Sequence, residues 1–198
     1  MIPTGFRGTV RRAATGFLLA LAVAAFPSAA ALRPAAPVGP APSEYDLKAV
    51  FLYNFTRYLQ WPEEDATGAF EIAVLGDSGI VAPLQEIAAK KTVRSAPIVV
   101  RRCEEPGQIG RPRILFLARP AAPSLKRALN AARGAGILTV GEEEGLAARG
   151  AAVNFVLREE TVKFEVSVKA LKAAGIQAGS QLLKLAIRIG GERPEDGR

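Results

Sequence analysis

The sequence predicts an α/β fold, in which a single mixed β-sheet is flanked by helices on both faces as a three-layer α/β/α domain. Two observations predict it. Amphipathic segments with helical spacing alternate with short apolar runs through the middle of the chain, and two alternating apolar runs near the C-terminus have the pattern of a hairpin. With 198 residues, of which 49% are hydrophobic and 23% charged, the chain is long enough to bury one core.

The composition argues against most catalytic and metal sites. The chain has no histidine, which removes Ser-His-Asp and Cys-His pairs and any histidine metal site. Its one cysteine, Cys103, permits neither an internal disulfide nor a cysteine-rich zinc site. This residue could be an exposed free thiol or a small buried hydrophobe. We therefore expect no cofactor and no metal, and a protein that acts by binding.

The N-terminus has the three parts of a secretory signal peptide at residues 1–31. Three arginines precede a ten-residue apolar stretch at 17–26, and small residues follow it. Ten residues are too short to span a hydrocarbon core of about 30 Å. Removing the segment takes away basic charge only, so no nucleic-acid partner is expected. A Pro/Ala-rich linker at 32–42, a domain at 43–190 and a C-terminal tail at 191–198 are expected to follow.

An amphipathic helix should open the domain. Ser43 and Asp46 have the spacing of an N-cap and an acidic first turn. One apolar stripe at spacings of three and four then comprises Leu47, Val50, Phe51, Phe55, Tyr58 and Leu59. The helix should stop near Gln60, because Pro62 excludes the preceding residue from the α-helical region.

The middle of the chain should alternate between strands and helices. Short apolar runs predict strands at 70–75, 98–101, 114–118 and 137–140. Helices are expected at 80–89 and at 124–133, the second of them capped by Ser124. Residues 141–150 contain three consecutive glutamates and three glycines, which predicts a loop with solvated carboxylates.

The last third of the domain should begin with an antiparallel hairpin. Residues 152–157 and 161–168 alternate in hydrophobicity on either side of a short charged turn. A short helix at 169–174, closed by Gly175, should follow, and a final amphipathic helix is expected at 180–189.

The segment Gly76-Asp77-Ser78-Gly79 is the most tempting catalytic motif. A strand that runs into G-D-S resembles the nucleophile turn of GDSL-type hydrolases, but that serine needs a histidine base, and this chain has none. The favoured interpretation is a tight turn between strand and helix, in which Asp77 or Ser78 caps the helix.

The first helix carries the best binding signal. Tyr53, Asn54, Arg57 and Trp61 accompany its apolar stripe, and interfaces favour Tyr, Trp and Arg. The alternative is that Trp61 simply completes the core. Glu165, in mid-strand between two apolar residues, could be a ligand contact, although an exposed strand face explains it more simply.

The chain resembles the YfiR family. Residues 48–62, KAVFLYNFTRYLQWP, are similar to its opening K-A-x-x-L-x-x-F-x-x-[FY]-x-x-W-P. VKFEV at 162–166 and SQLLKLA at 180–186 resemble its v-x-F-E-I-N strand and closing S-x-x-L-L-x-L-A helix. Two departures are that Pro112-Arg113 stand where the family often has Cys-His, and that Ser167 replaces its Asn. The disulfides of some members are therefore not expected.

The resemblance implies a non-enzymatic periplasmic regulator. It would bind the periplasmic part of a membrane-bound diguanylate cyclase and repress it, which lowers cyclic-di-GMP and restrains biofilm formation. It also implies a homodimer and sequestration by an outer-membrane, peptidoglycan-associated lipoprotein. The expected partner contacts are Tyr53, Asn54, Arg57 and Trp61, with Glu165 and Arg188 near the other end. The alternative is a periplasmic small-ligand receptor that acts on a sensor kinase.

Overall fold

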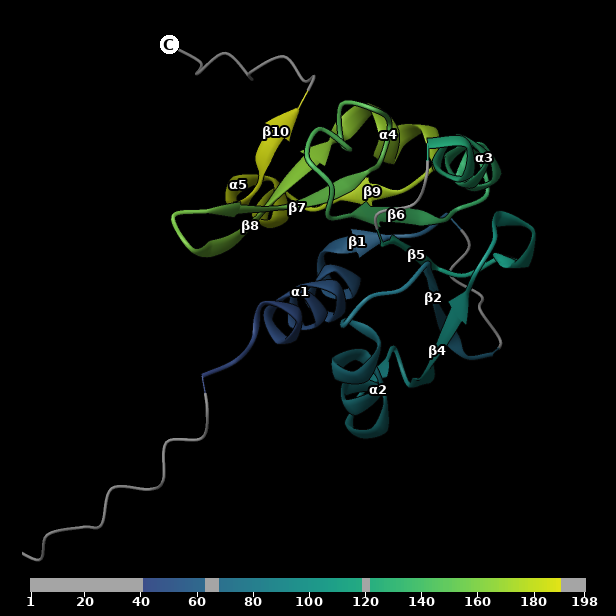
Figure 1. The fold of residues 1–198 in the computed structure, drawn as a ribbon, viewed down its shortest axis with the longest axis vertical. Coiled ribbons are helices and arrows are strands. Elements are labelled where there is room, and N and C mark those ends of the chain that lie inside the picture. Colours follow the sequence, from purple (N-terminus) through teal and green to yellow (C-terminus); the bar gives the residue numbers. More distant parts are fainter. Residues whose placement is uncertain (1–40, 63–67, 119–121, 190–198) are drawn as a thin grey trace, which may run out of the picture. The chain divides into compact units, whose positions relative to one another are not determined.

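The computed structural model describes residues 41–62, 68–118 and 122–189, which form one compact unit (Figure 1). The predicted signal peptide at 1–31, most of the linker at 32–42 and the tail at 191–198 lie outside the described residues. The predicted α/β class is confirmed, because helices cover both faces of a mixed sheet.

Eight strands form the main sheet. In spatial order they are β10 (Ile187–Ile189), β8 (Thr161–Ser167), β7 (Val153–Arg158), β6 (Leu138–Gly141), β5 (Ile114–Leu117), β2 (Phe70–Leu75), β4 (Ala96–Cys103) and β3 (Thr92–Val93). Neighbours are parallel except for the pairs β7–β8 and β3–β4. The predicted hairpin is confirmed as β7–β8, with Arg158 opposite Thr161.

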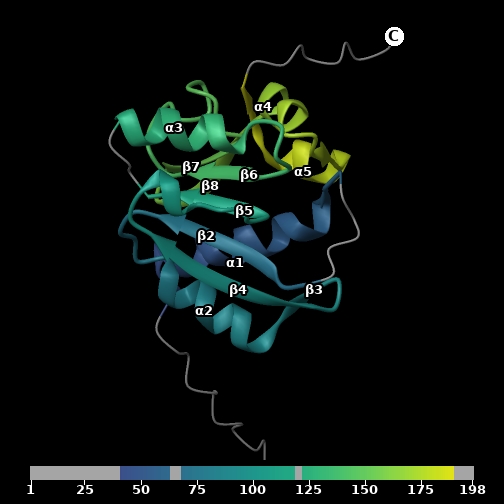
Figure 2. The same cartoon turned by 90° about the vertical axis from the view of Figure 1, so that its right-hand side faces the viewer.

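The helices divide between the two faces of the sheet. The first face carries α1 (Glu44–Tyr58), α2 (Val81–Lys90) and α5 (Ser180–Leu185), and the other carries α3 (Ala122–Ala132) (Figure 2). Helix α4 (Val168–Ala173) follows β8, and its Leu171 packs into the core on the α1 side. A short 3-10 helix, Pro106–Gln108, lies in the connection from β4 to β5. Two parallel neighbouring strands must be joined by a crossover that returns the chain to the same end of the sheet. This explains why helical segments alternate with β2, β4, β5 and β6.

Alternation along the central strands gives each face its own core. In β5, Ile114 and Phe116 pack on the side of α1, whereas Leu115 and Leu117 pack on the side of α3. All four are fully buried, as expected of a strand that is covered on both faces.

Helix α1 begins as the sequence predicts. The Ser43 hydroxyl accepts a hydrogen bond from the Asp46 backbone N–H at 3.2 Å, and the Asp46 carboxylate accepts one from the Ser43 N–H at 2.7 Å. Hydrogen bonding to the Asp46 carboxylate by the side chain and the backbone N–H of Ser43 holds the pKa of Asp46 below its ordinary value. This reciprocal capping box satisfies two backbone donors at the start of the helix.

Three expectations for the fold are wrong in detail. The final helix was expected to reach residue 189, but it ends at Leu185, and Ile187–Ile189 pairs with β8 as an edge strand. That pairing supplies partners to the open edge of β8, which helix periodicity cannot reveal. Helix α3 begins at Ala122, so Ser124 lies inside it and does not cap it. The sheet is also not single, because β1 (Leu59–Gln60) and β9 (Gln177–Ala178) form a second, two-stranded sheet.

Candidate functional site

The outward side of α1 presents three of the predicted contact residues. Arg57 is exposed, whereas Tyr53 and Asn54 are half-buried. The Tyr53 hydroxyl donates a hydrogen bond to the Thr92 carbonyl at 3.4 Å, which fixes the ring beside β3. Tyr53 and Arg57 are four residues apart, so they lie on one side of the helix.

Trp61, the fourth residue expected there, belongs to the core. Its side chain is 6% exposed, and its indole N–H donates to the Arg113 carbonyl at 3.3 Å. The ring packs edge-to-face on Phe70, with centroids 5.6 Å apart. These contacts fit the alternative interpretation, in which Trp61 completes the core rather than the surface.

The other two predicted contact residues lie away from this surface. Glu165 is half-buried in β8, and its carboxylate accepts a hydrogen bond from the Asn154 amide at 3.2 Å. Its neighbour Phe164 packs on Phe55 of α1, so Glu165 belongs to the opposite face of the sheet. Arg188 lies in β10, where the register places its backbone beside Val166. The structure therefore does not bring the six residues together as one site.

A buried ion pair joins α1 to the end of β6. The Lys48 Nζ lies 2.6 Å from a carboxylate oxygen of Glu142 and 2.6 Å from one of Glu44. The side chains of Lys48 and Glu142 are only 6% and 2% exposed. Burial disfavours the ammonium, but hydrogen bonds to both carboxylates outweigh it and raise the pKa of Lys48 above its ordinary value. The expectation of a solvated Glu142 is therefore wrong.

The turn between β2 and α2 contains the G-D-S-G motif. The Ser78 hydroxyl accepts a hydrogen bond from the Ile80 backbone N–H at 3.3 Å, and Gly76 has a φ of +95°. A Cβ at Gly79 would come within 2.7 Å of the Tyr45 ring, so α1 packs directly on this turn. This geometry supports the interpretation of a tight turn. The expected cap by Asp77 or Ser78 is wrong, because Ile80 is the N-cap of α2 and the helix has no side-chain cap.

Cys103 is a buried group at the end of β4. Its thiol lies 2.8 Å from a guanidinium nitrogen of Arg101. The same guanidinium group pairs with the Glu71 carboxylate at 2.6 Å and donates hydrogen bonds to the carbonyls of Gln108 and Ile109. Burial raises the pKa of the Cys103 thiol, although Arg101 opposes the shift. Of the two interpretations left open for Cys103, the structure shows the small buried hydrophobe.

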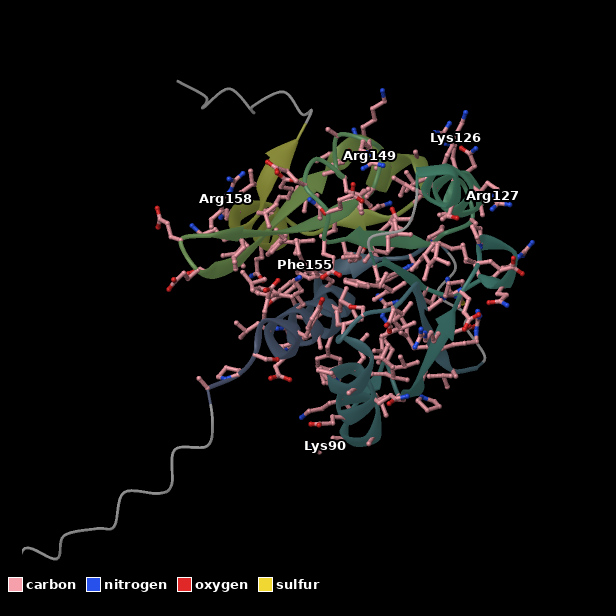
Figure 3. The ribbon with its side chains drawn as sticks, in the orientation of Figure 1. Lys90, Lys126, Arg127, Arg149, Phe155 and Arg158 are labelled. Carbon is pink, nitrogen blue, oxygen red and sulfur yellow. The ribbon has the colours of Figure 1, made fainter. Side chains whose placement is uncertain are left out.

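A groove of about 740 Å³ lies between α3, α4 and the segment 147–150. Its charged lining residues are Lys126, Arg133, Arg149 and Lys169. Figure 3 shows Lys126 and Arg149 on the side of the molecule that carries α3 and α4, far from Lys90 on α2. Its polar lining includes Thr139 and Ser167, which are buried, and its walls are largely apolar.

Sequence reasoning missed both the ion pair and the groove. For the ion pair, the available signal was a lysine next to the buried positions Ala49 and Leu52 of an amphipathic helix. For the groove, the signal was a pair of long stretches without Asp or Glu, at residues 106–141 and 166–191. These stretches contain α3 and α4, so the face that the two helices share is basic.

In a comparison with protein families, the model described as YfiR/HmsC-like matches residues 45–187. The match covers nearly all of the described chain, from the first turn of α1 to the start of β10. The chain belongs to the YfiR/HmsC-like family.

Membership in the YfiR/HmsC-like family indicates the class of function. The family is one of periplasmic regulators of diguanylate cyclase signalling, and its members act on a membrane sensor system. Within the described residues of this member, every helix is too short or too polar to span a lipid bilayer. The same residues contain no group of three or more His, Cys, Asp or Glu side chains that could hold a metal ion.

Solved structures similar to this YfiR/HmsC-like chain are distant. A conserved domain protein from Vibrio cholerae O1 biovar El Tor N16961 is 12% identical, with a TM-score of 0.52 over 74% of this chain and 60% of that one. An ABC domain from Streptococcus pneumoniae, solved with L-Trp, is 9% identical, with a TM-score of 0.49 over 73% and 59%. The chain thus spans about three-fifths of the length of each. The first likeness supports the fold alone. No curated protein matches the chain.

Proposed function

We propose that this protein is exported to the periplasm, binds the periplasmic part of an inner-membrane diguanylate cyclase and represses it. The family match over residues 45–187 carries the proposal. Repression is a shift of population: the regulator binds the inactive cyclase conformation more tightly than the active one, and the equilibrium moves accordingly.

The contact surface in this proposal is the outward side of α1. Arg57 is exposed there and makes no side-chain hydrogen bond or ion pair with the described residues, so its guanidinium is available to a partner carboxylate. Tyr53 adds an aromatic face that is already oriented by Thr92. Such a pre-positioned ring loses little conformational entropy on binding. Trp61 is buried and is therefore left out of this surface.

Co-purification tests the partner. The tagged full chain, processed in its own cells, is incubated with detergent-extracted inner membranes, and the captured proteins are identified by mass spectrometry. Recovery of a diguanylate cyclase is expected. If a sensor kinase is recovered without a cyclase, the proposed partner is wrong and the receptor hypothesis replaces it.

Substitutions in α1 test the surface. Arg57→Ala and Tyr53→Ala should each weaken cyclase capture, because truncating an interface hot spot costs about 2 kcal/mol or more. Arg127→Ala is the matched control, since Arg127 is an exposed arginine on α3, on the other face of the sheet. Equal capture by all three folded variants would remove α1 from the interface.

A further inference from the structure

The groove between α3 and α4 has an unbalanced charge. Its four ionisable lining residues, Lys126, Arg133, Arg149 and Lys169, are all cationic, and no carboxylate lines it among the described residues. Arg149 pairs with Glu143 at 2.8 Å, outside the lining. The other three make no ion pair or side-chain hydrogen bond with any described residue. Cations gathered around a partly enclosed space focus a positive potential there, which attracts anions.

Two hydroxyl groups add donors to the same groove. Thr139 and Ser167 are 5% and 8% exposed. The Thr139 oxygen accepts from the Ala152 N–H at 2.9 Å, and the Ser167 oxygen accepts from the Ala170 N–H at 3.3 Å. A hydroxyl can also donate one hydrogen bond, and neither group donates one to any described residue. Each therefore keeps an unused donor, which suits an anionic oxygen.

The groove is also shaped for more than a bare ion. Its volume of about 740 Å³ lies within the range of roughly 300–1,000 Å³ that is typical of small-molecule sites. Its apolar walls include Leu129, Ile137 and Ala170. The two helices are joined at one end, where the Gly134 N–H donates to the Ala173 carbonyl at 3.1 Å. The walls are therefore held in place before a ligand arrives.

We propose that this groove binds a ligand that carries a phosphate group attached to an apolar body. Lys126, Arg133 and Lys169 bind the phosphate oxygens, because guanidinium and ammonium groups form strong charge-assisted hydrogen bonds with them. The apolar body contacts Leu129 and Ile137. The proposal is independent of the cyclase, since no residue of α1 lines the groove.

Thermal unfolding of the full chain with inorganic phosphate tests whether the groove binds a phosphate group in solution. At constant ionic strength, set with sodium chloride, phosphate should raise Tm because it binds only the folded state. The double variant Arg133→Gln/Lys169→Gln should bind phosphate at least about tenfold more weakly than the unchanged chain. Lys90→Gln/Lys91→Gln removes the same charge from the end of α2 and should respond as the unchanged chain does. All four side chains are exposed, so both variants should fold.

Vesicle flotation tests the lipid source of the same group. Vesicles of phosphatidylcholine with phosphatidylglycerol are compared with vesicles of phosphatidylcholine alone. Binding that needs the anionic lipid and is lost in the groove variant supports the proposal, with a lipid headgroup as the phosphate. A phosphate-dependent Tm rise without flotation supports it with a soluble ligand. The proposal is overturned if neither probe binds, or if the groove and control variants respond equally.

Discussion

The two faces of the sheet are packed with different kinds of side chain. On the α1 face, Phe51, Phe55, Phe155 and Phe164 form a cluster with ring centroids 5.1–6.4 Å apart. On the α3 face, the packing residues of the helix include the small side chains Ala128 and Ala132, and a groove remains beside them. Large interlocking rings fill space completely, whereas small residues leave room. Truncation in the aromatic cluster is therefore expected to cost more stability than truncation at the wall of the groove.

Truncations on the two faces test this difference most directly. Phe55→Ala should lower the free energy of unfolding by about 3–5 kcal/mol, because the fully buried ring leaves a cavity. Leu129→Ala, at the half-buried groove wall, should cost only about 1 kcal/mol. Urea unfolding followed by circular dichroism measures both. Equal losses would mean that the two faces contribute alike to stability.

The buried ion pair sharpens the comparison on the α1 face. Lys48→Met should destabilise the chain by about 3 kcal/mol, because it leaves the buried Glu142 carboxylate without its cation. The double variant Lys48→Met/Glu142→Leu removes both charges and should recover most of that loss. If the double variant is as unstable as the single one, packing rather than charge accounts for the effect.

The raised pKa of Lys48 gives the ion pair a distinct pH dependence. The folded state holds the proton more tightly than the unfolded state, so this contribution to stability is fully present below the ordinary lysine pKa of 10.5. This contribution is lost as the pH rises through the raised pKa that Lys48 has in the folded state. Unfolding free energies measured at increasing alkaline pH should fall more steeply for the native sequence than for the Lys48→Met/Glu142→Leu variant. Parallel curves would contradict the assignment.

Cys103 on the α3 face offers a test without a change in stability. Because burial raises the pKa of its thiol, little thiolate is present at neutral pH, and the folded chain should react slowly with a thiol reagent. Labelling should accelerate by roughly a hundredfold or more when urea unfolds the chain. A thiol that reacts rapidly in the folded state would show that this region opens locally.

Local sequence signals predicted the elements that local forces determine. The cap at Ser43 and the hairpin β7–β8 depend on residues that are near in sequence, and both are present. The predicted apolar stripe of α1 is wrong in part, because Leu47 and Val50 are exposed and the buried side of the helix includes Ala49 and Leu52 instead. The end of the last helix depends instead on an unpaired strand edge about twenty residues earlier, so periodicity alone extended the helix through Ile187–Ile189. The small sheet was missed for the same reason, because it pairs Leu59 with Ala178.

The candidate sites also divide into those built from residues near in sequence, which were predicted, and those built from distant residues, which were missed. Tyr53, Asn54 and Arg57 were found together because one helix presents them. The groove combines Lys126 of α3 and Arg133, which directly follows that helix, with Lys169 of α4, and no short motif contains all three. Lys48 was recognised as part of a family motif, but its partner Glu142 lies 94 residues away, and only the fold places them in contact.

The lengths of the edge strands bear on self-association. The main sheet ends in β3, which has two residues and pairs only with Ala96 and Pro97 of the eight-residue strand β4, and in β10, which has three. An edge strand exposes unpaired backbone groups that can template a strand from another molecule, and short edges limit that hazard. From Ile98 to Cys103, however, β4 has only β2 as a strand partner among the described residues, so its outer edge is long enough to pair with a strand from another molecule.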